Sequence, residues 1–260
     1  MSNPLKSALA ALLSRTPLSR FPVRVRRGVA AGARWTLYPW TSYWRGTHEP
    51  AMQATLLGLG GGEIRGWSCW DLGAHFGLYS VGLARRVGPT GQVAAFEPNP
   101  VSFARLQRHR DMNDLSWLKL YAAAVSDHNQ GAELFTYGDL GTTTTHLPYE
   151  GETRTNLIGA LAVPTLRLDD LVAAGELRAP NFVKIDVEGH GHHALAGMRT
   201  TLASARPVLV AAFHSPQEIE GMMALLAPLN YSWREVGNDA VPAVIRPGAD
   251  YLFTPPPRPA

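Results

Sequence analysis

The chain has 260 residues, of which 45% are hydrophobic and 17% are charged. This length can bury one large α/β core or two small domains. The formal net charge is only +3, and the arginines that raise the pI to 9.2 are scattered along the chain. A nucleic-acid binder more often clusters them on one element with interleaved aromatic residues, so we expect no nucleic-acid partner.

Residues 1–66 are predicted to form an N-terminal arm and a helical cap. The basic stretch 20–34 is either a solvated arm or a contact for an anionic surface. The first 20 residues either pack as a terminal helix or lie on a membrane or a partner. The aromatic segment 40–50 is expected over the functional edge of a sheet, where Trp40, Tyr43 and Trp44 either anchor the cap or stack on a substrate.

From residue 67 onwards, short apolar runs alternate with amphipathic segments of helical length. Strands are predicted at 67–73, 92–98, 117–127, 181–189, 207–215, 231–237 and 250–256, and helices at 76–88, 100–113, 192–206 and 216–230. This alternation predicts one α/β domain over residues 67–256. Its fold is doubly wound, with a mostly parallel seven-stranded sheet covered by helices on both faces.

Cys69 is the single cysteine, and it lies inside the first predicted strand as a small core residue. No internal disulfide is therefore possible, and a reducing, cytoplasmic location is expected. The chain has no run of about 18 apolar residues, so no transmembrane helix is expected. Residues 257–260 are expected to fray, and no pattern in the sequence predicts an oligomeric state.

The segment 127–181 interrupts the rhythm and is predicted to be a long insertion on the substrate side, because connections of this length are usually functional or disordered. It contains a predicted hairpin at 131–140. The run from Thr142 to Thr145 either recognises a sugar-like or polyol substrate through its hydroxyls or forms an ordinary strand.

The loop "DLGAHFG" follows the first strand of this sheet, where ligands of open α/β sheets bind. Its glycines, Gly73 and Gly77, are sparser than those of a dinucleotide site, which bring the backbone close to a pyrophosphate. Asp71 would place a carboxylate near any phosphate, which is unfavourable. A carboxylate suits a ligand that carries an amine or a sulfonium.

Glu97, at the end of the second strand, can accept hydrogen bonds from both ribose hydroxyls. S-adenosylmethionine has these features and no phosphate.

Four motifs in order, "DLGAHFGLYS", "AAFEPNP", "VKIDVEGHGHHALAG" and "RPVLVAAFH", resemble the FkbM-type family of S-adenosylmethionine-dependent methyltransferases. The similarity covers roughly residues 45–235, and "GTHEP" is similar to the family's upstream segment. The resemblance implies a Rossmann-like class I methyltransferase fold. It also implies an O-methyltransferase that acts on a small hydroxylated acceptor, such as a sugar or a secondary metabolite.

The resemblance also implies the cofactor contacts. The methionine half would lie along the first loop, against Asp71, Gly73, Ala74, His75, Gly77 and Tyr79. Glu97 would hold the ribose, Pro98 and Asn99 would shape the adenine side, and Ala124 to Ser126 would approach the adenine ring.

The chain departs from the family pattern at three places. His75 stands where the family usually has Asn, "HGHH" follows "DVEG" where a further Glu is common, and Ala212 replaces the usual Glu two residues before His214. These departures keep open a non-catalytic module that has retained the cofactor fold. A second alternative is a nicotinamide-dependent oxidoreductase on the same kind of sheet, which Asp71 and the missing G-x-G-x-x-G disfavour.

Three residues at strand ends are the candidate catalytic groups. Asp186 and Glu188 follow the fourth strand, where they could deprotonate or orient a hydroxyl or bind a divalent cation, which we do not assume. Glu188 could instead cap the next helix. His214 ends the fifth strand as a possible general base or a satisfied polar residue. His190, His192 and His193 cannot all ligate one ion, because neighbouring helical positions point in different directions, so no metal site is assigned.

Overall fold

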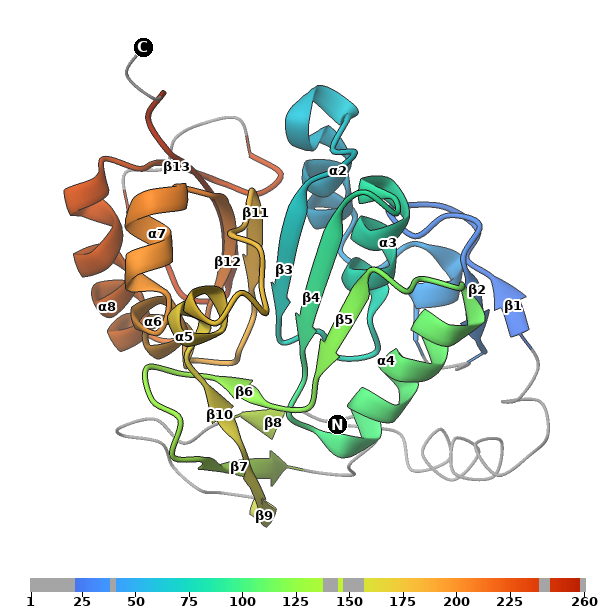
Figure 1. Ribbon diagram of the computed structural model, residues 1–260, viewed down its shortest axis with the longest axis horizontal. Helices are drawn as coiled ribbons and strands as arrows, with labels where there is room; N and C mark the ends of the chain where they lie inside the picture. The colour runs from blue at the N-terminus through green and yellow to red at the C-terminus, as the bar shows by residue number, and fades with distance from the viewer. Residues whose placement is uncertain (1–21, 38–40, 138–144, 147–156, 239–243, 258–260) are drawn as a thin grey trace.

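The computed structural model describes residues 22–37, 41–137, 145–146, 157–238 and 244–257 (Figure 1). Its helices are α2 (Pro50–Gly58), α3 (Leu78–Val87), α4 (Pro100–Met112), α5 (Leu168–Ala173), α6 (Gly191–Ala196), α7 (Arg199–Ala205) and α8 (Pro216–Leu226), with 3-10 turns η2 (Tyr43–Arg45), η3 (Leu59–Gly62) and η4 (Ala227–Leu229). The strands of the central sheet are β3 (Ser68–Leu72), β4 (Gln92–Phe96), β5 (Leu118–Tyr121), β11 (Phe182–Ile185), β12 (Val208–Phe213), β13 (Ser232–Glu235) and β14 (Ala249–Thr254).

The central sheet has seven strands in the order β13-β14-β12-β11-β3-β4-β5. Its pairs are parallel from β12 to β5, whereas β14 runs antiparallel to both β12 and β13. The predicted mostly parallel, seven-stranded sheet is therefore confirmed. Chain order reverses between β3 and β11, because β4 and β5 extend the sheet on one side and β12 extends it on the other. This reversal is the point at which open α/β sheets bind ligands.

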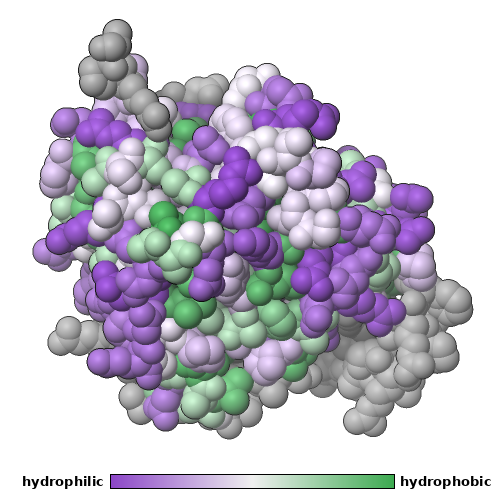
Figure 2. All heavy atoms as spheres, in the orientation of Figure 1, coloured by the Kyte–Doolittle hydropathy of each residue, from purple (hydrophilic) through white to green (hydrophobic). Residues whose placement is uncertain are grey.

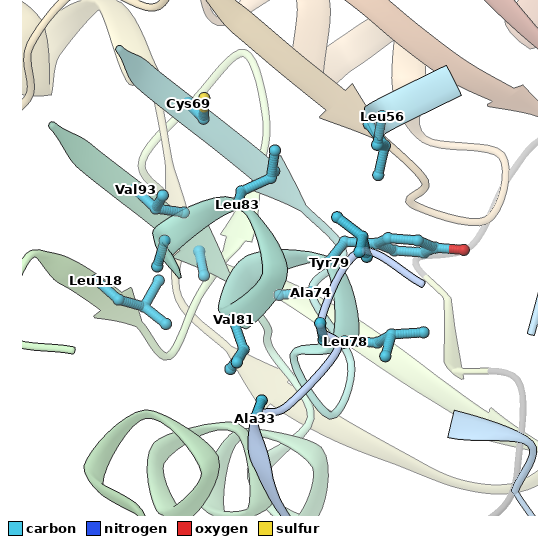
Figure 3. Packing of buried hydrophobic residues seen from close by; sticks show 14 of the residues in the cluster. Ala33, Leu56, Cys69, Ala74, Leu78, Tyr79, Val81, Leu83, Val93 and Leu118 are labelled. Atoms are coloured by element: carbon cyan, nitrogen blue, oxygen red, sulfur yellow. The ribbon is translucent and has the colours of Figure 1, made fainter. Parts of the chain in front are cut away.

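Alternating side chains bury both faces of the sheet. In β4, Val93 and Ala95 belong to a core cluster shared with α3 and the N-terminal region, whereas Ala94 and Phe96 belong to the cluster under α5 to α8. Figure 3 shows Val93 and Leu118 of the sheet beside side chains of α3. The two clusters explain why the strands read as continuous apolar runs, since a strand covered on both faces has no polar side.

Two predicted elements are each divided in the structure. The predicted strand 117–127 leaves the central sheet after Tyr121, and β6 (Ala124–Val125) pairs with β10 (Thr165–Leu166) of the insertion. The predicted helix 192–206 breaks into α6 and α7 around Gly197, where an added Cβ would lie 2.0 Å from the Ser126 carbonyl oxygen.

The described part of the predicted hairpin at 131–140, residues 131–137, holds one strand rather than two. Its strand β7 (Ala132–Tyr137) pairs instead with β8 (Thr145–His146) and β9 (Leu157–Val163), in a separate three-stranded sheet. Thr145 lies in β8, and the rest of the predicted threonine patch lies outside the described residues. The β10-β6 sheet and the β8-β7-β9 sheet lie at the lower end of the molecule in Figure 1. At this end, Figure 2 shows hydrophobic residues on the surface.

The described part of the N-terminal region is only partly helical. A two-stranded antiparallel sheet of β1 (Pro22–Arg24) and β2 (Arg34–Thr36) lies in and beside the basic stretch of the predicted arm, and the helical elements η2, α2 and η3 follow it. Tyr43 and Trp44 pack against the core cluster of α3, in agreement with the anchoring alternative. Trp40 and the first 21 residues lie outside the described residues. None of the described helices is long and apolar enough to span a bilayer.

Candidate active site

A cavity of about 320 Å³ opens at the carboxyl ends of β3, β4 and β11. Its floor is the loop after β3, one wall is the end of β4, and the opposite wall is the segment that follows β11. Tyr43, His48 and Glu49 of the N-terminal region line it from a further side, and Leu134 lines it from the insertion. The volume lies within the ~300–1,000 Å³ range of small-molecule sites.

Most of the predicted site residues meet at this cavity. Those that line it are Gly73, Ala74, His75, Tyr79, Glu97, Pro98, Ala124, Asp186 and Glu188. The predicted residues that do not line it are Asp71, Gly77, Asn99, Ser126 and His214. Asn99 is buried, and its side-chain oxygen caps α4 by accepting hydrogen bonds from the backbone N–H groups of Val101 and Ser102. Ser126 is also buried, with its Oγ 3.1 Å from His190 Nε2.

Gly73 holds the loop after β3 against the end of β11. Its φ is +83°, and an added Cβ would lie 1.8 Å from the Asp186 carbonyl oxygen. The backbone N–H groups of Gly73 and Ala74 both donate to the carbonyl oxygen of Phe96 at the end of β4. One turn therefore ties three strand ends together at the cavity, and only glycine fits its tightest point.

Gly73→Ala is expected to lower the free energy of unfolding by about 3 kcal/mol, because it adds a backbone clash to a left-handed φ. Urea unfolding monitored by circular dichroism measures this loss. Gly61→Ala is the matched control, since Gly61 also has a positive φ, of +67°, but nothing within 4 Å of an added Cβ; its expected cost is about 1 kcal/mol. Equal losses in the two variants would contradict the close approach at Gly73.

His75 is held in a left-handed conformation beside Gly73, with a φ of +50°. Its ring stacks on that of Phe76 at 3.7 Å, and its Nδ1 lies 2.9 Å from the hydroxyl of Tyr43. Burial lowers the pKa of His75 to about 4, so the imidazole is neutral near pH 7. The histidine that replaces the family's usual Asn thus links the N-terminal region to the cavity floor.

Glu97 follows β4 and is only 6% exposed. Its Oε2 accepts a hydrogen bond of 2.7 Å from the backbone N–H of His75, and its Oε1 accepts one of 2.8 Å from the backbone N–H of Asn99. Burial raises the pKa of Glu97 to about 7, although these two N–H donors favour the ionised form. Glu97 therefore presents a carboxyl group of fixed orientation to the cavity, as expected of a residue that binds the ribose of the cofactor.

Asp71 is buried next to the cavity but does not line it. It is fully buried, and Ser80 Oγ donates to its Oδ2 at 2.5 Å. Lys184 is its partner in the β3–β11 register, on the same face of the sheet. Desolvation raises the pKa of Asp71, an effect that the nearby Lys184 ammonium and the Ser80 hydroxyl oppose.

Lys184 is a functional candidate that the sequence interpretation missed. Its side chain is 2% exposed, its Nζ donates to Asp186 Oδ2 at 2.9 Å, and it lies 5.1 Å from the centre of the Tyr79 ring. Burial favours a lower pKa, but the carboxylates of Asp186 and Asp71 outweigh it and raise the pKa of Lys184 above its ordinary value. A lysine inside the apolar run "FVKI" was the available signal, because a buried Lys requires a partner.

Asp186, Glu188 and His214 meet at the end of β11 and β12. His214 Nε2 lies 3.7 Å from Asp186 Oδ1 and 3.3 Å from Glu188 Oε2. Each residue offers a donor atom within 4.8 Å of the others, as a divalent cation would require. In this structure Lys184 and His214, two basic groups, already face these carboxylates. A cation would have to compete with Lys184 for Asp186, and His214 would have to be neutral to act as a ligand.

Glu218 of α8 supports His214 from the other side and was also missed. It is fully buried, and it accepts hydrogen bonds from the backbone N–H groups of His214, at 2.7 Å, and Gly191, at 2.8 Å. Burial favours a lower pKa for His214, but Glu218, Glu188 and Asp186 outweigh it and raise the pKa above its ordinary value. The S-x-x-E spacing from Ser215 to Glu218 predicts only a helix cap. The contacts of Glu218 with His214 and Gly191 could therefore not be predicted from this local pattern.

The rings of the three histidines after β11, His190, His192 and His193, lie close together, with ring centroids 4.1–6.3 Å apart. His190 lies near Ser126, and His193 Nδ1 pairs with Asp127 Oδ2 at 3.0 Å. Among the described residues, the three-donor group that could hold an ion is Asp186, Glu188 and His214, and these histidines are not part of it.

The comparisons with known proteins point to one family. The sequence profile described as "Methyltransferase FkbM domain" matches residues 71–236. The chain is 30% identical over 141 residues to "Hexuronic acid methyltransferase AglP" of Haloferax volcanii, a match that covers 54% of each chain. It is 28% identical over 155 residues to "2-O-methyltransferase NoeI" of Sinorhizobium fredii, which covers 55% of this chain and 61% of that protein. The matches thus span between half and two thirds of these relatives.

Among solved structures, a methyltransferase FkbM from Methylobacillus flagellatus KT superposes with a TM-score of 0.49 and 19% identity. The superposition covers 72% of this chain and 43% of that one.

Proposed function

Because the chain belongs to the FkbM methyltransferase family, we propose that it is an S-adenosylmethionine-dependent O-methyltransferase whose acceptor is a hydroxyl of a small molecule, such as a sugar. The observation that carries the proposal is that one cavity is lined both by most of the predicted cofactor residues and by Asp186 and Glu188. One relative is named a hexuronic acid methyltransferase and the other a 2-O-methyltransferase. These names support a sugar-like acceptor.

The residues of the cavity fit the proposed cofactor. Glu97 offers a buried carboxylate for ribose hydroxyls, and Phe96, Val125 and Leu134 offer apolar surface for a flat base. Among the described residues, Lys184 is the lysine that lines the cavity, and it is paired with Asp186 rather than available to a phosphate. This combination favours a nucleoside without phosphate over a dinucleotide.

S-adenosylmethionine supplies an electrophilic methyl group on a sulfonium. The chain contributes the proton acceptor and its alignment. Asp186 Oδ1 is placed to take the proton of the acceptor hydroxyl, while Asp186 Oδ2 stays bonded to Lys184 Nζ. The raised pKa of His214 keeps its imidazole protonated to higher pH, which suits an orienting role beside Asp186 better than a role as the base. Holding donor and acceptor together supplies proximity.

Transfer of a labelled methyl group from S-adenosylmethionine to a panel of neutral sugars, uronic acids and polyols tests this function. We expect an O-methyl ether on at least one acceptor class, identified by mass spectrometry. Binding of the cofactor without transfer to any member of a broad panel would contradict catalysis and favour the non-catalytic alternative.

A further inference from the structure

We infer that Glu49, in the N-terminal region, supplies the carboxylate that binds the α-ammonium group of the cofactor's methionine half. The sequence interpretation gave this side of the cofactor to Asp71. The inference rests on the proposed function, since it names a residue of the same cofactor site, and it assigns the N-terminal region a part in cofactor binding.

Asp71 is badly placed for direct contact. It is fully buried, it does not line the cavity, and its Oδ2 is bonded to Ser80 Oγ of α3. The same face of the sheet carries Lys184 directly opposite Asp71 in the register. Its Oδ1 is also buried and has no hydrogen-bond partner among the described residues, but it is not exposed to the cavity, so an ammonium group in the cavity needs a carboxylate that lines it.

Glu49 lines the cavity and immediately precedes α2. It occupies the N-cap position of that helix, but its side chain makes no capping hydrogen bond. Its Oε2 instead accepts a hydrogen bond of 2.5 Å from the Tyr79 hydroxyl, and its Oε1 lies 3.1 Å from His48 Nε2. The backbone of Glu49 has a φ of +42°, an uncommon conformation for a residue with a side chain. The carboxylate is therefore held by the cavity rather than by its own helix.

The neighbourhood of Glu49 matches the amino-acid end of the ligand. Tyr79 lies in the first turn of α3, and Leu78 and Gly73 line the same cavity. Figure 3 shows the Tyr79 hydroxyl directed away from Val93 and Leu118 of the core. The N-terminus of α3 favours the carboxylate of the methionine half, and the carboxylate of Glu49 favours its ammonium group. The methionine half of the cofactor carries a carboxylate and an ammonium group side by side. The nucleoside half, which Glu97 would hold, carries neither.

The charge on Glu49 is secure near neutral pH. Burial favours a higher pKa, but the hydrogen bonds from His48 and Tyr79 and the charge of Lys184 outweigh it and lower the pKa of Glu49 to about 2. The side chain keeps 41% of its surface exposed, so it is accessible from the cavity. An ionised, accessible carboxylate is what an ammonium ligand requires.

Two ligands that differ in the amino-acid half test the inference. S-adenosylhomocysteine carries the α-ammonium but no sulfonium, whereas 5′-methylthioadenosine has the same adenine, ribose and thioether without the amino acid. Calorimetry should show that Glu49→Gln weakens S-adenosylhomocysteine binding about 30-fold and changes 5′-methylthioadenosine binding less than about twofold. Glu63→Gln, at an exposed acidic residue that does not line the cavity, is the control and should change neither affinity.

Each other outcome has a definite meaning. Unchanged S-adenosylhomocysteine affinity in Glu49→Gln would overturn the assignment, and so would equal weakening of both ligands, which would show that Glu49 only shapes the fold of the cavity. A wild-type chain that binds neither ligand would overturn the proposed function itself, and this assignment with it. Thermal melting of the variants shows whether the fold is retained.

Discussion

Asp186→Asn is expected to lower the rate of methyl transfer about 10³-fold while leaving the affinity for S-adenosylhomocysteine within about threefold of wild type. Asp186 lines the cavity, and its Oδ1 is not the oxygen that binds Lys184 Nζ. An amide at this position cannot take the proton of the acceptor hydroxyl. The amide oxygen can still accept a hydrogen bond from Lys184, and the carboxylate of Asp71 still acts on this buried cation, so the fold should persist.

Single-turnover rates with a labelled methyl group measure this effect. The matched control is Asp127→Asn, because Asp127 is also paired with a histidine, His193, but does not line the cavity. Its transfer rate should stay within about twofold of wild type. Near-normal turnover in Asp186→Asn would remove Asp186 from the chemistry and leave His214 and Glu188 as the remaining candidates.

Glu97→Gln is expected to weaken S-adenosylhomocysteine and 5′-methylthioadenosine about 100-fold each, since both ligands carry the ribose hydroxyls. The free energy of unfolding without ligand should stay within about 1–2 kcal/mol of wild type. The amide loses one acceptor for the N–H groups of His75 and Asn99, but it also removes the cost of a buried charge. Unchanged affinity for both ligands would reject Glu97 as the ribose contact.

The pH dependence of binding gives a second test of Glu97. Burial raises its pKa to about 7 in the folded protein, whereas hydroxyl donors of a bound ribose favour the ionised carboxylate. Binding should therefore weaken as the pH falls below about 7 and level off above it, because at low pH the carboxyl group must lose its proton before it can accept both hydrogen bonds. Glu97→Gln should lose this dependence, since it has no proton to give up.

The sheet was predictable because its signals are local. Each central strand is a short apolar run between helical segments, and burial on both faces removes any polar alternation that would have suggested an exposed sheet. The site residues at strand ends followed from the same pattern, since parallel strands bring their carboxyl ends to one edge. This placement indicated Glu97, whereas the assignments of Asp186 and Gly73 also rested on the resemblance to the FkbM family.

Contacts between distant segments could not be predicted in this way. Gly197 lies close to the Ser126 carbonyl oxygen, and Glu218 accepts a hydrogen bond from the Gly191 N–H, so both contacts join segments far apart in the sequence. Asp71 looked like a ligand residue because it stands beside the glycine loop. Its burial under α3 follows from the pairing of β3 with β11 and from Ser80, neither of which is visible in the loop itself.

The most direct test of the account is calorimetry of the wild-type chain with S-adenosylhomocysteine and, separately, with NAD. We expect one-to-one binding of S-adenosylhomocysteine with micromolar or tighter affinity and no measurable binding of NAD, because the carboxylates of Glu49, Glu97 and Asp186 line the cavity and would repel a pyrophosphate. Tight binding of NAD with no response to S-adenosylhomocysteine would contradict it and favour an oxidoreductase on the same kind of sheet.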